Sequence, residues 1–324
     1  MVGIIDGYGR NISYLRVSVT DRCNFRCSYC MPNGHVSWFP KDEVLSYEEI
    51  LQIIRVAVNA GISKVRLTGG EPLVRQGIIQ FVADIKKIAG VRDLSMTTNG
   101  SLLSEFAMPL KRAGLDRVNI SLDTLRKDRF SQISGRNMFG EVIKGIESAK
   151  QVGFEPIKLN MVVMNGINTD ELIDFARISI DKPFEVRFIE YMPVHSRGRD
   201  LLFPTSRIKE IINAAGWGKL VEQPSGDGPA TIFRFSKGRG SIGFISAITD
   251  HFCNHCNRIR LTADGRLKLC LLSNAEVDIK GMLRVGVSEA DLEKLLRRSV
   301  WQKPAQHDLN EVQSCRRGMS QTGG

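Results

Sequence analysis

The sequence predicts an α/β protein, an incomplete (β/α)6 barrel of the TIM type followed by an α+β extension that contains a second group of cysteines. Three observations predict this fold. Short apolar strands alternate with helical patterns over the first two-thirds of the chain, polar residues gather where these strands end, and a Pro-, Gly- and Ser-containing run at 222–229 precedes a set of shorter strands. We therefore assign residues 1–225 to the barrel and residues 226–324 to the extension.

The barrel elements follow one another in a regular order. Ser46 is a candidate N-cap with Glu49 three residues later, and apolar residues then recur at helical spacing until Gly61. Strands are predicted at 14–19, 64–68, 93–98, 117–122, 156–163 and 185–189, and further helices at 77–88, 102–113, 141–152 and 169–178. Six strands that alternate with helices indicate a parallel sheet, either open or curved into a barrel.

The ends of these strands favour the barrel. They are followed by polar stretches at 68–71, 97–99, 121–123 and 190–192, and Asn160 lies on the fifth strand. Barrel enzymes build their active sites from such strand ends. An open doubly wound sheet also binds ligands there, but no glycine-rich fingerprint follows the first strand.

In the extension, strands are predicted at 231–235, 241–246, 258–261 and 267–271, with Asp264-Gly265 as the hairpin turn between the last two. Helices are expected at 277–283 and 289–297. Residues 302–324 are polar and are expected to lack regular structure.

Composition narrows the class of protein. The formal charge of +10 favours anionic partners, although surface lysines and arginines alone could account for it. No run of eighteen apolar residues and no secretory signal pattern is present, so we expect a cytoplasmic protein without a membrane partner. In that compartment seven cysteines indicate metal binding or catalysis rather than disulfides.

The first cysteine motif follows the first strand. Cys23, Cys27 and Cys30 have the spacing C-x3-C-x2-C. Three thiolates can hold three irons of a [4Fe–4S] cube and leave the fourth open, whereas such clusters usually have four cysteine ligands. A zinc site with His35 as fourth ligand is the alternative, although zinc favours C-x2-C pairs.

This motif, with an aromatic residue before its last cysteine, resembles that of the radical S-adenosylmethionine (SAM) superfamily. The resemblance implies that the open iron binds SAM and that electron transfer to SAM yields a 5'-deoxyadenosyl radical. Gly69-Gly70-Glu71-Pro72 matches the superfamily motif that holds the amino group of SAM. The SAM-binding residues that the resemblance implies are Tyr29, Gly70, Glu71, Thr98, Ser121 and Met192.

The second motif, Cys253-x2-Cys256 with Cys270 thirteen residues further on, spans the predicted hairpin, which would bring Cys270 back toward Cys256. Spacing alone leaves a structural zinc site open, with His251 or His255 as the fourth ligand. The stretch from Cys253 to Cys270 resembles the C-terminal motif of the GTP 3',8-cyclases of molybdenum-cofactor biosynthesis. The resemblance implies a second [4Fe–4S] cluster whose open iron faces the guanine of GTP.

The same resemblance implies the reaction. A hydrogen atom is removed from C3' of GTP, C3' bonds to C8, and reduction gives 3',8-cyclo-7,8-dihydro-GTP. Cations that alternate along barrel strands would point into the lumen, where they need an anion. The resemblance places these residues at the GTP: Arg16, Lys64, Arg66, Lys158, Arg258 and Arg260. It also implies that the terminal Gly323-Gly324 enters the active site and is needed for activity, so these glycines are assigned as catalytic together with Cys23, Cys27 and Cys30. Arg75 and Arg187 are weaker candidates for the GTP site, and Cys315 has no assigned role.

Two other functions remain open at this point. One is a different radical SAM enzyme with an auxiliary cluster, such as a peptide-maturing enzyme, which would not need the paired cations. The other is a zinc-dependent nucleic-acid-binding protein, which would leave the Gly-Gly-Glu-Pro motif and the βα units without a role. For the cyclase we expect a homodimer, an unidentified electron donor and a downstream enzyme that takes the product, but no nucleic-acid partner.

Overall fold

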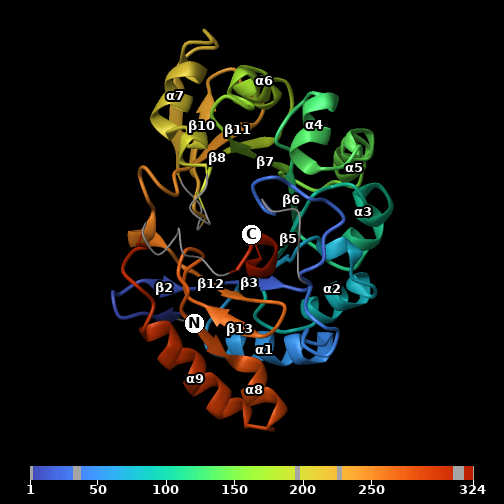
Figure 1. Ribbon diagram of the computed structural model, residues 1–324, viewed down its shortest axis with the longest axis vertical. Coiled ribbons are helices and arrows are strands. Elements are labelled where there is room, and N and C mark those ends of the chain that lie inside the picture. The colour runs from blue at the N-terminus through green and yellow to red at the C-terminus, as the bar shows by residue number, and fades with distance from the viewer. Residues whose placement is uncertain (1–2, 32–37, 194–197, 225–227, 309–316, 324) are drawn as a thin grey trace.

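A computed structural model describes residues 3–31, 38–193, 198–224, 228–308 and 317–323. Its framework is one twelve-stranded sheet in the order β14-β13-β12-β3-β4-β5-β6-β7-β8-β11-β10-β9. The eight strands from β12 to β11 are parallel to one another. The sheet curves around a central space, with helices on its outer side (Figure 1). The eight are β3 (Tyr14–Ser18), β4 (Lys64–Thr68), β5 (Asp93–Thr98), β6 (Arg117–Ser121), β7 (Lys158–Val163), β8 (Glu185–Glu190), β11 (Ser241–Ile245) and β12 (Arg258–Leu261).

The six predicted barrel strands and their helices are confirmed, and the largest shift at a strand start is in β7, which begins at Lys158 rather than at residue 156. The capping box forms as expected, because Glu49 N donates to Ser46 Oγ (3.1 Å) and Ser46 N donates to Glu49 Oε2 (2.7 Å). The predicted helices are α1 (Tyr47–Asn59), α2 (Ile78–Lys86), α3 (Leu103–Arg112), α5 (Phe139–Gln151) and α6 (Leu172–Asp181).

Several short elements were not predicted. Helix α4 buries only Phe130, Ile133 and Ser134, so its sequence shows little helical periodicity. The unpredicted elements before residue 256 are β1 (Ile4–Ile5), β2 (Asn11–Ile12), α4 (Lys127–Ser134), α7 (Thr205–Asn213), β9 (Leu220–Gln223) and the 3-10 turns η1 (Pro72–Val74), η2 (Thr169–Glu171), η3 (Arg199–Leu201) and η4 (Cys253–His255).

The predicted extension does not form a separate sheet. Strand β11 pairs in parallel with β8 at one end of the barrel sheet, and β12 pairs in parallel with β3 at the other. Strand β10 (Thr231–Phe235) continues outward from β11, and the hairpin of β12 with β13 (Arg266–Lys268) continues through β14 (Glu276–Asp278). The boundary at residue 225 stays a prediction, but the hydrogen-bonded sheet runs across it.

Two predictions in this region are wrong in detail. The second hairpin strand ends at Lys268 instead of residue 271, and residues 277–278 belong to β14 rather than to a helix. Asp278 instead caps α8 (Ile279–Arg284), since its carboxylate accepts from Gly281 N at 2.9 Å. Helix α9 (Glu289–Trp301) matches the last predicted helix.

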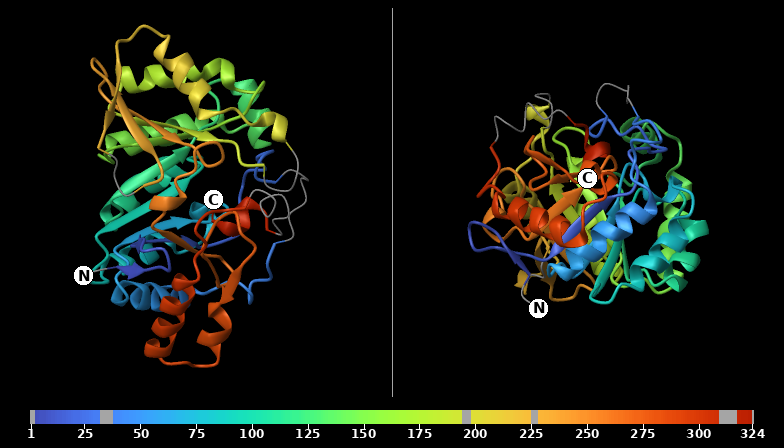
Figure 2. Two further views of the ribbon diagram at one scale, coloured as in Figure 1. Left: turned by 90° about the vertical axis from the view of Figure 1, so that its left-hand side faces the viewer. Right: turned by 90° about the horizontal axis from the view of Figure 1, so that it is seen from below.

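The prediction that residues 302–324 lack regular structure is also wrong. A short helix, α11 (Met319–Thr322), lies inside the curve of the sheet with Ser320 and Thr322 each 3% exposed (Figures 1 and 2). Four residues form no helix on their own, so tertiary contacts hold this turn.

Side chains alternate across the sheet. Apolar residues such as Val17, Leu67, Met96 and Ile120 face the helices and form the core. Polar residues of the opposite parity therefore face the central space. No helix in the described ranges is long and apolar enough to cross a membrane.

Candidate functional site

All six cysteines of the two predicted motifs line one cavity inside the curved sheet. Each of them is a free thiol. The two motifs are more than 220 residues apart in sequence, and the pairing of β12 with β3 brings them to opposite ends of the same pair of strands.

The first motif lies in the loop after β3. The loop is fixed by backbone bonds to α4, from Arg26 N to Ser134 O (2.8 Å) and from Ser28 N to Ile133 O (2.9 Å). Burial raises the pKa of Cys23 to about 11 and that of Cys30 to about 12. Such thiols need a positive partner to stay ionised, and iron provides one, so this donor set fits a three-cysteine [4Fe–4S] cluster.

Glu71, in the Gly-Gly-Glu-Pro motif, is a buried carboxylate without a cation among the residues the structure covers. It is 1% exposed and accepts from Thr98 Oγ1 (2.7 Å), Asn99 N (2.6 Å) and Leu73 N (3.1 Å). Burial raises the pKa of Glu71 to about 7 despite these bonds. An ammonium group of a ligand would supply the missing positive charge.

Gly70 precedes this carboxylate where the chain passes close to the cysteine loop. A Cβ atom at Gly70 would lie 2.3 Å from Arg22 O, so no larger residue fits. Thr98 is bonded to Glu71, and Ser121 and Met192 line the cavity as predicted.

Tyr29 is bonded to Asp123, a residue absent from the predicted site. The Tyr29 hydroxyl donates to Asp123 Oδ2 (2.9 Å), and Asp123 Oδ1 accepts from Val162 N (2.8 Å). Asp123 thus ties the cysteine loop to the ends of β6 and β7. The position of Asp123 directly after the predicted strand 117–122 was the feature of the sequence that could have indicated its role.

The second motif forms as the hairpin predicted. Register pairs Arg260 with Lys268, so Cys270 returns toward Cys256 at the start of β12. Although burial acts in the opposite direction, the charges of Arg258 and Lys303 lower the pKa of the Cys256 thiol to about 6. His307 Nδ1 lies 3.5 Å from Cys253 Sγ, and the ring of His251 packs against the ring of His307.

The thiols of Cys253, Cys256 and Cys270 are a donor set that fits an iron–sulfur cluster. In the described ranges no three His, Cys, Asp or Glu side chains converge closely enough to hold one metal ion. A cube that takes one cysteine at each of three irons does not require them to converge. His35, the fourth zinc ligand in the alternative for the first motif, lies outside the described residues, as does Cys315.

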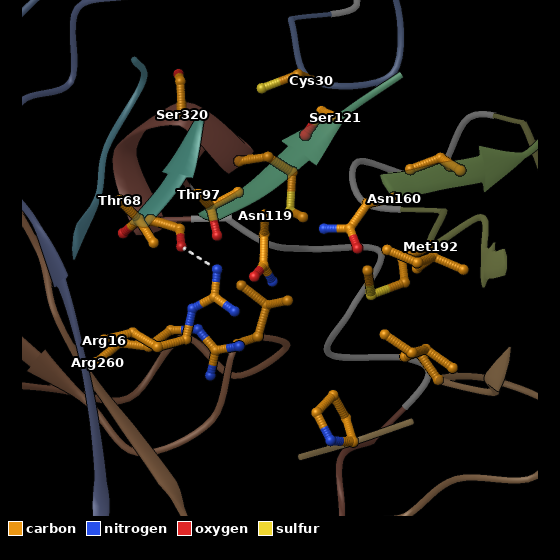
Figure 3. Close-up of a pocket in the computed structure, with 18 of the residues that line it drawn as sticks. Arg16, Cys30, Thr68, Thr97, Asn119, Ser121, Asn160, Met192, Arg260 and Ser320 are labelled. Atoms are coloured by element: carbon orange, nitrogen blue, oxygen red, sulfur yellow. Dashed lines mark hydrogen bonds between the residues drawn. The ribbon is translucent and has the colours of Figure 1, made fainter. Parts of the chain in front are cut away.

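Five arginines line the cavity: Arg16, Arg66, Arg187, Arg258 and Arg260. Arg16 stands between Arg260 and Arg66 in the strand register, and Figure 3 shows Arg16 and Arg260 side by side. Burial, and next the charge of Arg260, lower the pKa of Arg16 well below its usual value. Buried cations at such close quarters form a site for a multiply charged anion. Arg187, a weaker candidate from the sequence, belongs to this group.

The two predicted lysines do not line the cavity. Lys158 Nζ pairs with Glu185 at 2.7 Å, and Glu185 also accepts from Arg187. Lys64 is half-buried at the first position of β4. Their contact with GTP therefore stays a prediction. Arg75 donates to Val19 O and Leu45 O and has a structural role.

Several buried polar atoms inside the curve have no hydrogen-bond partner among the residues that the structure describes. Figure 3 shows the side chains of Asn119 and Asn160, which both line the cavity. Such groups are costly to bury unless a ligand or water completes them. The unpartnered atoms that belong to cavity-lining residues are Thr97 Oγ1, both amide atoms of Asn119, Asn160 Oδ1, Arg16 Nε and Arg260 Nε.

The C-terminal helix brings Gly323 into the cavity. Arg16 Nη2 donates to Gly323 O (3.0 Å), and the Ser320 backbone amide hydrogen-bonds Cys30. Gly323 has φ 77°, and a Cβ atom there would lie 2.6 Å from Thr68 Oγ1, so only glycine fits. Gly324 lies outside the described residues, and a catalytic role for either glycine stays a prediction.

Comparisons with known proteins show the family to which the chain belongs. The Radical SAM superfamily model matches residues 17–178, and the Molybdenum Cofactor Synthesis C model matches residues 184–309. The GTP 3',8-cyclase of Heliobacterium modesticaldum is 48% identical over 99% of this chain and 100% of its own length. Those of Thermodesulfovibrio yellowstonii and Moorella thermoacetica are 46% and 45% identical, each over 98% of this chain and 99% of theirs.

Solved structures confirm the fold. Streptococcus suis SuiB bound to S-adenosylmethionine matches with a TM-score of 0.65 and 13% identity, over 92% of this chain and 73% of that one. At that identity the match supports the fold alone. Because the curated relatives match almost from end to end, the chain belongs to the radical SAM superfamily and, within it, to the GTP 3',8-cyclase family.

Proposed function

We propose that this chain is a GTP 3',8-cyclase, a lyase that uses SAM and two [4Fe–4S] clusters to convert GTP to 3',8-cyclo-7,8-dihydro-GTP at the start of molybdenum-cofactor biosynthesis. The observation that carries the proposal is one cavity lined by both three-cysteine sets and by five arginines. A peptide-maturing enzyme or a zinc-dependent nucleic-acid-binding protein leaves this enclosed arginine cluster unexplained.

The strand register explains how one substrate could reach both cysteine sets. Cys256 lies just before β12, and the loop with Cys23 follows the other end of its partner β3. A five-residue strand spans about 16 Å, which suits a nucleotide lying along the strands. Arg16 and Arg260 are neighbours in this register, between the two sets.

When bound, the first cluster and SAM supply a 5'-deoxyadenosyl radical. Glu71 would hold the SAM ammonium, and Tyr29, fixed by Asp123, would lie against the same cofactor. The arginines would bind the triphosphate, and the unpartnered amides of Asn119 and Asn160 could bond the ribose. Holding the substrate at several points limits it to one orientation, which selective removal of one ribose hydrogen requires.

Gly323 narrows the cavity beside Arg16, where it would exclude water from a bound substrate. The electron donor, the downstream enzyme, the homodimer and the cytoplasmic location belong to this proposal as expectations.

Anaerobic reconstitution tests the proposal. We expect about eight irons per chain, and about four after Cys23, Cys27 and Cys30, or Cys253, Cys256 and Cys270, are replaced by alanine. About four irons with one zinc would instead make the second site structural.

Activity is tested with SAM, dithionite and GTP deuterated at C3', with ATP as the control. Transfer of the deuterium to 5'-deoxyadenosine, together with loss of GTP, is the expected result. Formation of 5'-deoxyadenosine without deuterium, or equal consumption of ATP, would refute the cyclase.

A further inference from the structure

Lys303, just after α9, is a buried lysine with an unusual environment. Lys303 is 2% exposed, and its ammonium donates to the carbonyl of Leu269. It forms no ion pair with a carboxylate in the described part of the chain, whereas the equally buried Lys268 pairs with Glu276 at 3.2 Å. An unpaired buried charge is destabilising, so we expect an anionic group to lie near Lys303 in the functional protein.

The groups around Lys303 belong to the second cysteine motif. Leu269, whose carbonyl accepts from Lys303, directly precedes Cys270. The charge of Lys303 also acts on the thiols of Cys253 and Cys256. Lys303 is therefore bonded to the backbone of the second motif, whose thiols become thiolates when they bind iron.

A second buried cation fixes this arrangement. Arg10 is 8% exposed, and its Nη1 donates to Cys253 O and to Ala305 O, both at 2.8 Å. Its Nη2 donates to Pro304 O at 2.6 Å, and its Nε pairs with Asp6 at 2.6 Å. Arg10 thus ties the 303–305 segment to the backbone of a cluster ligand, from a position 243 residues away in sequence.

We propose that Lys303, held in place through Arg10, is a positioning residue that supplies the counter-charge of the second cluster and raises its reduction potential. The inference rests on the two-cluster content of the proposed function. Reduction adds a negative charge to a cluster, and a fixed cation in a medium of low dielectric constant stabilises that form. Arg258 and Arg260 face the substrate cavity, and Arg10 is neutralised by Asp6, so Lys303 remains as a counter-charge for the cluster when GTP occupies the two arginines.

The test measures the second cluster alone, in the full chain with Cys23, Cys27 and Cys30 replaced by alanine. Lys303→Met, Lys303→Arg and the control Lys111→Met are made in this background. Lys111 also donates from its ammonium to a backbone carbonyl, that of Gly153 at 2.9 Å, but it belongs to helix α3 and has no contact with the second cysteine motif in the described part of the chain. Iron per chain is counted, and the reduced cluster is titrated against potential by electron paramagnetic resonance.

For Lys303→Met we expect the ratio of reduced to oxidised cluster at a given potential to fall at least tenfold, a shift of about 59 mV for one electron. Lys303→Arg and Lys111→Met should titrate close to the parent. Loss of iron from Lys303→Met with retention in Lys303→Arg would also support the counter-charge.

An unchanged titration of Lys303→Met would overturn the inference. So would equal iron loss in Lys303→Met and Lys303→Arg, because packing rather than charge would then explain the effect. A parent that binds no iron at all would instead refute the two-cluster function itself, which separates the two failures.

Discussion

Arg317 is expected to hold the C-terminal helix in the cavity, and Arg317→Ala should release it. The guanidinium donates to Asp264 Oδ1 and Oδ2 (3.0 and 2.8 Å) and to Glu276 Oε2 (2.8 Å). Asp264 lies in the turn between β12 and β13, and Glu276 begins β14. Two residues after Arg317, α11 begins, and it carries Gly323 to Arg16.

The free energy of docking that Arg317→Ala should remove can be judged from the burial of this ion pair. The side chains of Arg317 and Asp264 are 18% and 11% exposed, so solvent screens them less than a surface pair. Surface pairs contribute up to about 1 kcal/mol, and hydrogen bonds to charged groups about 1.5–3 kcal/mol. We take about 2 kcal/mol for the anchor, which corresponds to a roughly 30-fold fall in the ratio of docked to undocked helix.

Hydrogen–deuterium exchange of the amides of α11 measures that ratio. The matched control is Arg266→Ala, since Arg266 pairs with Asp278 on the same hairpin at 3.1 Å but with side chains 38% and 44% exposed. Arg317→Ala should speed exchange about 30-fold and lower cyclase activity, while Arg266→Ala should change exchange less than about fivefold. Equal exchange in Arg317→Ala and wild type, or equal effects of both variants, would refute the anchor.

The same anchor should depend on pH in one direction. Burial acts to raise the pKa of Asp264, but the hydrogen bonds from Arg317 and Thr262 and the charge of Arg317 together outweigh it and hold that pKa below its usual range. The contribution to docking is therefore complete above the ordinary aspartate pKa and is lost as the pH falls through the lower pKa of the folded state. Relative to the intrinsic exchange rate at each pH, the protection of the α11 amides should therefore fall only in acid.

Four further predictions concern the site itself. Glu71→Gln should weaken SAM binding to the reconstituted protein about 10- to 100-fold by calorimetry, since it removes the charge from a hydrogen-bonded carboxylate; an unchanged affinity would mean that Glu71 does not meet the ammonium. In the ligand-free protein, burial raises the pKa of Glu71 to about 7, so Glu71 contributes fully to the free energy of unfolding only below its unfolded pKa. This contribution should fall by about 3 kcal/mol as the pH rises to 7. Urea unfolding of Glu71→Gln should lack this decrease of stability with pH. In iron-free protein at pH 7, iodoacetamide should modify Cys256, whose pKa is about 6, well before Cys23, whose pKa is about 11, and equal rates by mass spectrometry would contradict the cationic setting of Cys256. Arg260→Ala should raise the Kd of GTP about 10- to 100-fold with SAM binding retained, and loss of both affinities would point to a folding defect instead.

The sequence was informative where local patterns determine structure. The six barrel strands, the capping box at Ser46 and the hairpin at Asp264-Gly265 each depend on a short stretch of chain. The cysteine ligands were also predictable, because their spacing within a loop or hairpin is set by covalent distance.

The missed features depend on contacts between distant segments. Neither Arg10 nor Lys303 belongs to a motif, and each becomes notable only when the fold buries it beside the second cysteine set. The helix at residues 319–322 is stabilised by contacts with Cys30 and Arg16, which no local propensity encodes. Parity placed Lys158 inside the barrel, but parity does not show that Glu185 is its partner there.

The register between β12 and β3 links the cysteine chemistry to the cation site. Arg258 pairs with Tyr14, and Arg260 pairs with Arg16, so both arginines of β12 share the inward parity of β3. Because side chains alternate along a strand, a slip of one residue would turn both arginines into the apolar layer under the helices. Cys256 is two residues before Arg258, so the register that aims the arginines inward also fixes the start of the second cluster loop. The spacing from Cys256 to Arg260 is thus set by the sheet as well as by the cluster. The site is complete only when β12 of the extension pairs with β3 of the barrel.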